Sequence, residues 1–341
     1  MIQAVDVGTS EFRSLFRQGG RLVGRRCAAC YIAIPRDPVT DKWIGRLRIR
    51  TLECDGSRIV VGTEAAELAH VLRLPLVPML VEGRVPASDP IGRQLLAVTL
   101  ESLAPQRARI SEVLMTLPGN DVDPDDQGVA LLTRLFRLRG PAVRLGHSGT
   151  AMAHACLKPH RYTGLVINLG AAFCSASLVR LGQPLVEMTI PVGGRWIDDR
   201  FARTRGRFLH DAAGRRILDI FGVEAWKRTV DLRSDTEGHA DLAVLRDLYR
   251  EVAVALAAKL EQELSANRHA RKMARPVPVI LSGGGVAMGG FDLLLRAELT
   301  RLSLPFPVGE TELAAHDPFA VARGLLIARE TGSAGILKRA A

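Results

Sequence analysis

The amino-acid sequence predicts an α/β fold in which two similar halves close on one ligand. Near the N-terminus, an apolar segment at residues 2–5 runs directly into a polar, glycine-containing turn at residues 6–10. Residues 165–167 and 277–281 repeat this pattern, because each apolar segment leads into a turn of glycines or other small residues. A strand that ends in such a turn directs backbone N–H groups toward an anion such as phosphate. The recurrence predicts a duplicated fold around a central cleft.

Length and composition fit a globular protein with two domains. The chain has 341 residues, and a domain usually takes about 100 to 200. Hydrophobic residues make up 47% and charged residues 24%, which excludes a disordered chain. The sequence has no apolar run of about 18 residues and no signal-peptide pattern at its start. We therefore expect a cytoplasmic protein.

The net charge of +10 comes from arginines that are spread along the chain rather than gathered in a tail. Such a surface attracts anionic lipid headgroups, nucleic acid or acidic proteins through a screened, nonspecific force. An ordinary solvated surface explains the same charge equally well. Because no helix-turn-helix or RNA-binding motif accompanies it, we expect no specific nucleic-acid partner.

Cysteines and acidic residues suggest metal sites only weakly. The chain has five cysteines, and an odd number without a secretion signal favours reduced thiols. The spacing of Cys27 and Cys30 matches redox and zinc motifs, but no second ligand pair follows. We expect small buried thiols in a strand. The acidic loop at residues 118–126 lacks the glycine and closing glutamate of a calcium loop, so we expect a solvated turn.

The first half reads as a strand meander followed by helices. Residues 22–34, 43–54 and 59–61 are rich in apolar and β-branched residues and are separated by turn residues, which predicts three strands. Residues 91–103 carry leucines at helical spacing and should form a helix that packs on this sheet. Residues 110–117 should form a central strand.

The second half begins with a hairpin at residues 162–181 that mirrors the first turn motif. A long helix is predicted at residues 241–264, where leucines form one stripe that suits a core-facing helix. A strand at 277–281 and a helix at 290–302 follow. The tail at residues 331–341 is expected to fray.

Taken in order, these motifs resemble those of the bacterial actin MreB over nearly the whole chain. The matching segments are Asp6-Val-Gly-Thr9, Val61-Gly62-Thr-Glu64-Ala65-Ala66, Leu117-Pro118, Ile167-Asn168-Leu-Gly170, Val192-Gly193-Gly194-Arg-Trp-Ile-Asp198, Leu281-Ser-Gly283-Gly284-Gly285 and Asp317-Pro318-Phe-Ala-Val321-Ala322-Arg323-Gly324. The resemblance implies an actin-like fold of two duplicated domains with RNase H-like cores around a central nucleotide cleft. The first domain would span residues 1–158, with a small subdomain inserted at about 27–70, and the second residues 159–341, with one at about 200–270.

The resemblance also implies which residues contact nucleotide. They are Asp6, Gly8, Thr9 and Ser10 in the first phosphate loop, Gly170 and Ala171 in the second, and Gly283, Gly284, Gly285 and Val286 in the adenosine motif. Asp6 is also a candidate ligand for Mg²⁺. The implied cofactor is ATP or ADP with Mg²⁺, bound weakly or not at all because of the departures that follow.

Two departures fall on residues that handle the phosphates. The family has an aspartate in the second phosphate loop, where this chain has Asn168, followed by Ala171, Ala172 and the bulky Phe173. The glutamate pair that precedes a small-residue helix in the family corresponds to His147 and Ser148, so no carboxylate remains there in the sequence. Because metal ions neutralise phosphate charge in phosphoryl transfer, ATP hydrolysis is expected to be impaired or absent.

A third departure depends on a local alignment with the family's Ala-Glu-x-Ile-Lys helix. Aligned on the glycine at position 222, the ribose-contacting glutamate and lysine of the family become Arg215 and Leu218. The family is an ATPase, whereas this chain has substitutions at three of its nucleotide-handling positions.

The resemblance implies a cytoskeletal or scaffolding protein that serves cell shape or cell-wall synthesis. Its partners would be further copies of itself, another MreB-type filament, or an anionic membrane reached through an apolar loop such as residues 74–81. An N-terminal amphipathic anchor is not expected, because the first strand begins at once. Two alternatives remain: an active ATPase or kinase of the same fold, and an adaptor that binds another filament or a membrane complex. Asp198, the candidate base of a kinase, is expected to cap a helix instead.

Overall fold

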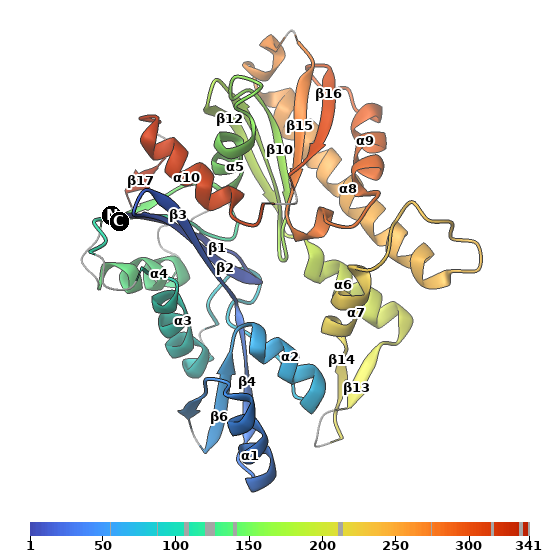
Figure 1. The fold of residues 1–341 in the computed structure, drawn as a ribbon. Helices are drawn as coiled ribbons and strands as arrows, with labels where there is room; N and C mark the ends of the chain where they lie inside the picture. The colour runs from blue at the N-terminus through green and yellow to red at the C-terminus, as the bar shows by residue number, and fades with distance from the viewer. Residues whose placement is uncertain are drawn as a thin grey trace.

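The computed structural model describes residues 1–54, 56–86, 88–105, 109–119, 127–138, 142–210, 214–273, 275–314, 317–333 and 337–339. Figure 1 shows two lobes, each built on one large sheet, with a smaller extension below each lobe. Most of the acidic loop at 118–126, and residues 334–336 and 340–341 of the tail, lie outside the described residues.

The two large sheets share one topology, which confirms the predicted duplication. The six-stranded sheet has the order β17-β9-β8-β1-β2-β3, and the five-stranded sheet has the order β16-β15-β10-β11-β12 when read in the same direction. In each, an antiparallel meander continues into parallel neighbours. The strands of the first sheet are β1 (Ile2–Val7), β2 (Glu11–Gln18), β3 (Arg21–Ala28), β8 (Glu112–Thr116), β9 (Ala142–Leu145) and β17 (Lys338–Arg339). Those of the second are β10 (Gly164–Leu169), β11 (Cys174–Arg180), β12 (Gln183–Ile190), β15 (Val277–Ser282) and β16 (Val308–Leu313).

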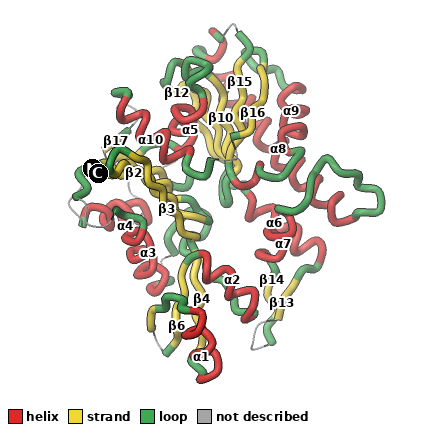
Figure 2. The backbone as a smooth tube through the Cα atoms, viewed as in Figure 1, coloured by secondary structure: helices red, strands yellow, loops and turns green. Residues whose placement is uncertain are grey.

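Each large sheet is covered by a helix that follows the other sheet in the chain. Helix α5 (Ser148–Cys156) follows a strand of the first sheet but packs on β10 and β11 of the second. Helix α10 (Ala320–Glu330) follows the second sheet but packs on β1, β2 and β8 of the first. The two helices also contact each other between the sheets, as Figure 2 shows. Their apolar residues form a shared core with both sheets, and this core joins the halves behind the cleft.

A separate four-stranded sheet extends the first half, and a hairpin extends the second. The small sheet has the order β5-β6-β4-β7. Its elements are β4 (Cys30–Pro35), α1 (Pro38–Leu47), β5 (Leu52–Cys54), β6 (Ser57–Val61), α2 (Thr63–Leu72) and β7 (Val77–Pro78). The second extension contains α6 (Gly194–Arg205), β13 (Phe208–His210), β14 (Arg216–Leu218) and α7 (Ile220–Lys227).

The predicted strand at residues 43–54 is wrong over most of its length. Helix α1 covers its first part, and only residues 52–54 form a strand. Helix α1 begins at Pro38 because the Asp37 side chain accepts hydrogen bonds from the backbone N–H groups of Val39 and Thr40, and because proline suits the first turn of a helix.

Helices α3 (Pro90–Ser102), α8 (Ala240–Ala266) and α9 (Phe291–Arg301) agree with the predicted positions. Helix α4 (Gln127–Arg137) and the short turns η1 (Ala270–Lys272) and η2 (Gly284–Val286) had not been predicted. The tail does not fray throughout, because β17 pairs with β9. No helix in the described part of the chain is long and apolar enough to cross a bilayer.

Cys27 and Cys30 are free thiols, as predicted for small residues in strands. Burial raises the pKa of Cys27 to about 11 and that of Cys30 to about 12, and nearby glutamates add to the first shift. Both thiols therefore stay protonated near neutral pH, which makes them poor nucleophiles and poor metal ligands.

Candidate functional site

One row of paired residues crosses the first sheet at the end of β1. Asp6 lies opposite Arg13 of β2 and Thr116 of β8, and Arg13 lies opposite Arg26 of β3. Directly paired residues point to the same face of a sheet. We call Arg26, Arg13, Asp6 and Thr116 the first row.

The Asp6 carboxylate is engaged on both oxygens. Its Oδ1 accepts a hydrogen bond from Thr116 Oγ1 at 2.8 Å, and its Oδ2 lies 3.5 Å from Arg13 Nη1. Burial raises the pKa of Asp6, although the charge of Arg13 and the hydrogen bond from Thr116 act in the opposite direction. The carboxylate is thus held by this chain's own donors.

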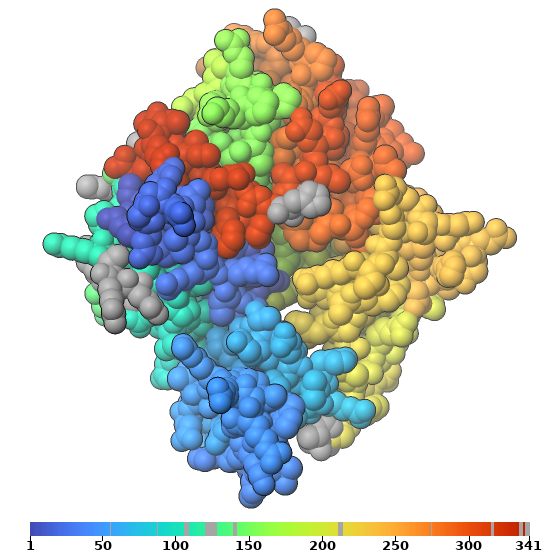
Figure 3. All heavy atoms as spheres, viewed as in Figure 1, coloured from blue at the N-terminus to red at the C-terminus, as the bar shows by residue number. Residues whose placement is uncertain are grey.

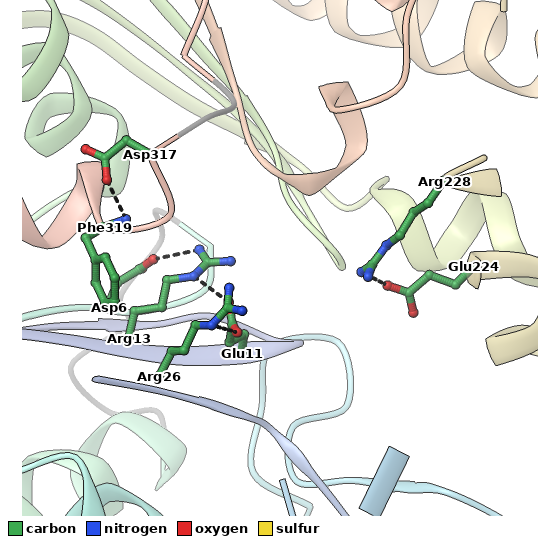
Figure 4. Close-up of polar contacts among 8 residues, drawn as sticks. All are labelled: Asp6, Glu11, Arg13, Arg26, Glu224, Arg228, Asp317 and Phe319. Carbon is green, nitrogen blue, oxygen red and sulfur yellow. Dashed lines mark hydrogen bonds and ion pairs between the residues drawn. The ribbon is translucent and has the colours of Figure 1, made fainter. Parts of the chain in front are cut away.

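Arg13 lies between two carboxylates. Its Nε donates to Glu11 Oε2 at 2.7 Å, and Arg26 Nε lies 3.6 Å from the other oxygen of Glu11. Burial disfavours the charged guanidinium, but the charges of Asp6 and Glu11 outweigh this effect and raise the pKa of Arg13. Figure 4 shows this cluster at the cleft side of the β2–β3 hairpin. Arg13 was not among the site residues predicted from the sequence.

A tight turn follows Asp6 where the first phosphate loop was predicted. The Gly8 N–H donates to the Glu11 carbonyl at 3.2 Å, and a Cβ at Gly8 would lie 2.7 Å from that carbonyl oxygen. Only glycine fits so tight a turn. Thr9 is buried, and the Ser10 carbonyl accepts from Ala29 N at 2.8 Å.

The second sheet has a matching row without charge. Asn168 of β10 lies opposite Ser175 of β11 and Ser282 of β15, and Ser175 lies opposite Thr189 of β12. We call Thr189, Ser175, Asn168 and Ser282 the second row. By strand order, Asn168 takes the place of Asp6 and Ser175 that of Arg13.

The other predicted loops meet at the end of this row. Gly194 N donates to the Gly170 carbonyl at 2.9 Å, and a Cβ at Gly193 would lie 2.6 Å from the Ala171 carbonyl oxygen. Gly283 has a φ of +97°, and a Cβ there would lie 2.3 Å from the Leu169 carbonyl oxygen. Glycine is therefore required where the adenosine motif, which continues as Gly284, Gly285 and Val286 in η2, touches the second phosphate loop.

Phe173 joins the two halves at the tip of the β10–β11 hairpin. Its ring lies beside Gly83 of the first half, close enough that a Cβ there would meet Phe173 Cε2 at 2.6 Å. The ring and Pro118 help line a cavity of about 290 Å³ between the halves.

A carboxylate from strand β12 lies at the N-terminus of α5, although the segment at 147–149 itself carries none. His147 Nε2 is 3.4 Å from Glu187 Oε2, and Thr150 Oγ1 donates to the other oxygen of Glu187. Glu187 comes from β12, whose residues pair with β11 beneath α5. Ser148 begins the helix, whose N-terminus has no side-chain cap. No local signal links His147 to a residue 40 positions later.

The helix predicted around Arg215 and Leu218 is also wrong. Leu218 ends β14, and Arg215 precedes that strand. The next element, α7, carries Glu224 and Lys227 with the spacing of the family's Glu-x-x-Lys. Figure 4 shows Glu224, bonded to Arg228, across the open space from the Arg13 cluster. The Glu-x-x-Lys spacing of residues 224–227 could have identified Glu224 from the sequence. The alignment on the glycine at position 222 instead placed the motif at Arg215 and Leu218.

Lys227 and Asp198 form a buried ion pair behind the second phosphate loop. Lys227 Nζ lies 2.5 Å from Asp198 Oδ1 and donates to the Gly194 carbonyl at 3.2 Å. Asp198 lies inside α6 and not at its cap, so the predicted capping role is wrong. Burial raises the pKa of Asp198 to about 6, although Lys227 acts to lower it.

The site therefore lies between the halves at the ends of β1 and β10. Figure 3 shows the surface hollowed between the light-blue extension of the first half and the yellow segment of the second. At the equivalent strand ends, the first half has charged side chains and the second has hydroxyls and an amide, while Glu224 of α7 adds a carboxylate from the second half.

Comparisons with known proteins identify a family and several structures with the same fold. The Volactin family model matches residues 1–329. A MamK structure solved as a double helical filament is similar with a TM-score of 0.69 at 16% identity, covering 96% of this chain and 98% of MamK. MreB5 of Spiroplasma citri bound to ADP is similar with a TM-score of 0.65 at 16% identity, covering 98% of both chains. The same protein bound to AMPPNP gives a TM-score of 0.67 at 16% identity, covering 98% of this chain and 97% of MreB5.

No match was found among curated proteins. At such low identity the similar structures establish the fold, and the predicted actin-like fold is confirmed.

Proposed function

We propose a function from the premise that this chain belongs to the Volactin family: it is an actin-like cytoskeletal protein that assembles into filaments and binds a nucleotide between its halves. The fold covers nearly the whole length of MamK, which was solved as a filament. Head-to-tail contacts that do not close produce open filaments, and a duplicated two-lobed chain suits such stacking.

The nucleotide would lie along the ends of β1 and β10. The turns that contain Gly8 and Gly170 would hold the phosphates, and η2 would contact the adenosine. Glu224 replaces Arg215 and Leu218 as the residue proposed to contact ribose, because α7 faces the cleft. The ADP and AMPPNP complexes of the MreB5 structures support a nucleotide in this fold.

ATP hydrolysis is proposed to be impaired. The observation that carries this proposal is the uncharged second row, in which Asn168 occupies the place that Asp6 has in the first row. An amide neither neutralises phosphate charge nor accepts a proton from water.

The cellular role proposed is a scaffold for cell shape or cell-wall synthesis in the cytoplasm. The chain would assemble with itself or with a complete MreB-type filament. The net charge of +10 supports a peripheral contact with an anionic membrane surface.

Sedimentation with ATP, measured together with phosphate release, tests this function. We expect the protein to pellet as filaments with ATP while phosphate release stays slow. Glu224→Gln should weaken ATP binding, whereas Glu237→Gln, an exposed residue outside the cleft, should not. Failure to pellet with ATP and with ADP would contradict filament assembly, and brisk phosphate release would contradict the impaired site.

The His147–Glu187 pair favours an active ATPase as the second candidate function. A carboxylate that orients a histidine is a common way to prepare a general base. If this pair activates water, Glu187→Gln should reduce phosphate release by about 10-fold or more. Glu312→Gln is the matched control, because Glu312 contacts His160 at 2.9 Å on the surface. Equal rates in the two variants would exclude this candidate.

A further inference from the structure

The side chains at the first phosphate loop do not suit the Mg²⁺ that accompanies ATP in actin-like proteins. Mg²⁺ at nucleotide sites is usually bound through one or two carboxylates together with water and the substrate phosphates. Asp6 has its two oxygens engaged by Thr116 and Arg13, and Asn168 offers only a neutral amide. Among the described residues no group of three or more His, Cys, Asp or Glu side chains could hold a metal. Asp6, predicted to be a metal ligand, is therefore poorly placed for that role.

The first row also contains a permanent cation, Arg13, beside Asp6. Arg13 lies directly opposite Asp6, on the face of the sheet that turns toward α10 and the second half. Its side chain is 29% exposed, so a ligand can reach it. Nε contacts Glu11 and Nη1 contacts Asp6, while Nη2 has no hydrogen-bond partner in the described parts of the chain. The guanidinium is thus held in place with donors to spare.

Arginine suits phosphate in both charge and geometry. Its planar donors form two parallel hydrogen bonds to phosphate oxygens, and its charge does not depend on pH in the physiological range. The carboxylates of Asp6 and Glu11 fix the side chain before a ligand arrives, which lowers the entropy lost on binding. Arg26 adds a second positive charge at Glu11.

We propose that Arg13 takes the place of the divalent cation, so that this site binds a nucleoside diphosphate or triphosphate without Mg²⁺. The inference rests on the proposed nucleotide-binding function and specifies how that site neutralises the phosphate charge. It gives the second half a passive role, because the neutral row there contributes hydrogen bonds and no metal ligand.

Calorimetric titration of the full-length protein with ADP and ATP, in Mg²⁺ and in EDTA, tests the proposal. We expect dissociation constants within about threefold of each other under the two conditions. Arg13→Gln should weaken binding in EDTA by about 10-fold or more, and Arg13→Lys should recover part of the loss. Arg17→Gln is the matched control, because Arg17 lies on the same strand and face, is 54% exposed and pairs with Glu330.

The outcomes separate this inference from the proposed function. Binding in Mg²⁺ that weakens 10-fold or more in EDTA would overturn the inference and leave nucleotide binding intact. Absence of binding in both conditions would overturn both. Equal losses in Arg13→Gln and Arg17→Gln would show a general charge effect and would also overturn the inference. If Arg13→Gln fails to fold, the wild-type comparison and Arg13→Lys still decide.

Discussion

The two halves have the same strand order, yet their equivalent rows differ in charge. The first row contains Arg26, Arg13, Asp6 and Thr116, and the second contains Thr189, Ser175, Asn168 and Ser282. Each position in one row has its counterpart in the other through the sheet topology. The two halves therefore share one backbone arrangement, but only the first row contains charged side chains.

Besides Glu224 of α7, which faces the cleft, the second half contains a buried ion pair behind the second predicted phosphate loop. Asp198 and Lys227 pair with each other behind Gly194, and their side chains are 2% and 7% exposed. Within the two rows, charge is available to a ligand only in the first half, and the Asp198–Lys227 pair of the second half supports its loop instead.

Removing the buried cation should produce the largest change. Lys227→Met leaves the buried Asp198 carboxyl without its cation, and breaking a buried pair in this way costs about 3–5 kcal/mol. The free energy of unfolding, measured in urea at pH 7, should fall by that amount. At pH 5 the loss should be smaller, because Asp198, whose pKa is raised to about 6, is then mostly protonated.

Two variants check that explanation. Asp198→Asn combined with Lys227→Met removes both charges and should recover much of the stability. Lys259→Met removes an exposed partner of Glu263 and should change stability by no more than about 1 kcal/mol. A loss in Lys227→Met no larger than that would show that the second half does not depend on its buried pair.

The second-largest change in stability should come from removing the hydroxyls of Thr116 and Ser282, which lie at equivalent ends of the two rows. Thr116 donates to the buried carboxylate of Asp6, and a hydrogen bond to a charged group contributes about 1.5–3 kcal/mol. Thr116→Val should therefore lower the unfolding free energy by about that amount. Ser282→Ala, at the equivalent position beside the neutral Asn168, should cost no more than about 1 kcal/mol. Equal losses would mean that the difference in charge has no energetic consequence.

The sequence predicted the fold well wherever a strand, turn or helix is specified by residues that are neighbours in the chain. Apolar runs that end in glycine located β1, β10 and β15, and the leucine stripe located α8. The prediction failed at α1, where the apolar residues around Trp43 suggested a strand although Asp37 and Pro38 are helix-start signals.

The site was predictable only where it is made of sequence neighbours. The glycine turns lie where expected, and the register of the β1–β2 hairpin could have placed Arg13 opposite Asp6, since residues 8–11 close it. Glu187 could not have been found, because its contact with His147 depends on α5 crossing to the second sheet. Long-range packing of this kind leaves no local signal.

Restoring a carboxylate to the second row should change metal dependence. Asn168→Asp gives both rows an acidic residue, and a coordinating carboxylate should raise ATP affinity in Mg²⁺ by roughly 10-fold. In EDTA the same variant should bind ATP more weakly than the wild type, because the added carboxylate then repels the phosphate groups. Asn168→Ala, which removes the amide without adding charge, is the control. Calorimetry that shows no Mg²⁺ dependence in Asn168→Asp would mean that the second row does not reach the phosphates.

The helices that cover the two sheets should differ slightly in their response to acid. Helix α10 covers the first sheet with apolar residues, whereas α5 buries His154 against Tyr162 in the second half. Burial lowers the pKa of His154 below its ordinary value of 6.5. The unfolded chain therefore takes up a proton as the pH falls below about 6.5 while the folded chain resists it, so this residue lowers stability on acidification.

This acid effect is measurable as a difference between two proteins. The melting temperature of the wild type relative to His154→Leu should be lower at pH 5 than at pH 7, because only the wild type carries the buried imidazole. His70→Gln, which changes an exposed histidine of α2, should leave the relative melting temperature unchanged. A constant difference between wild type and His154→Leu at both pH values would show that His154 takes up its proton as readily in the folded chain as in the unfolded one. Helices α5 and α10 would then respond to acid in the same way. The two halves would differ only in the charge of their rows and in the buried Asp198–Lys227 pair.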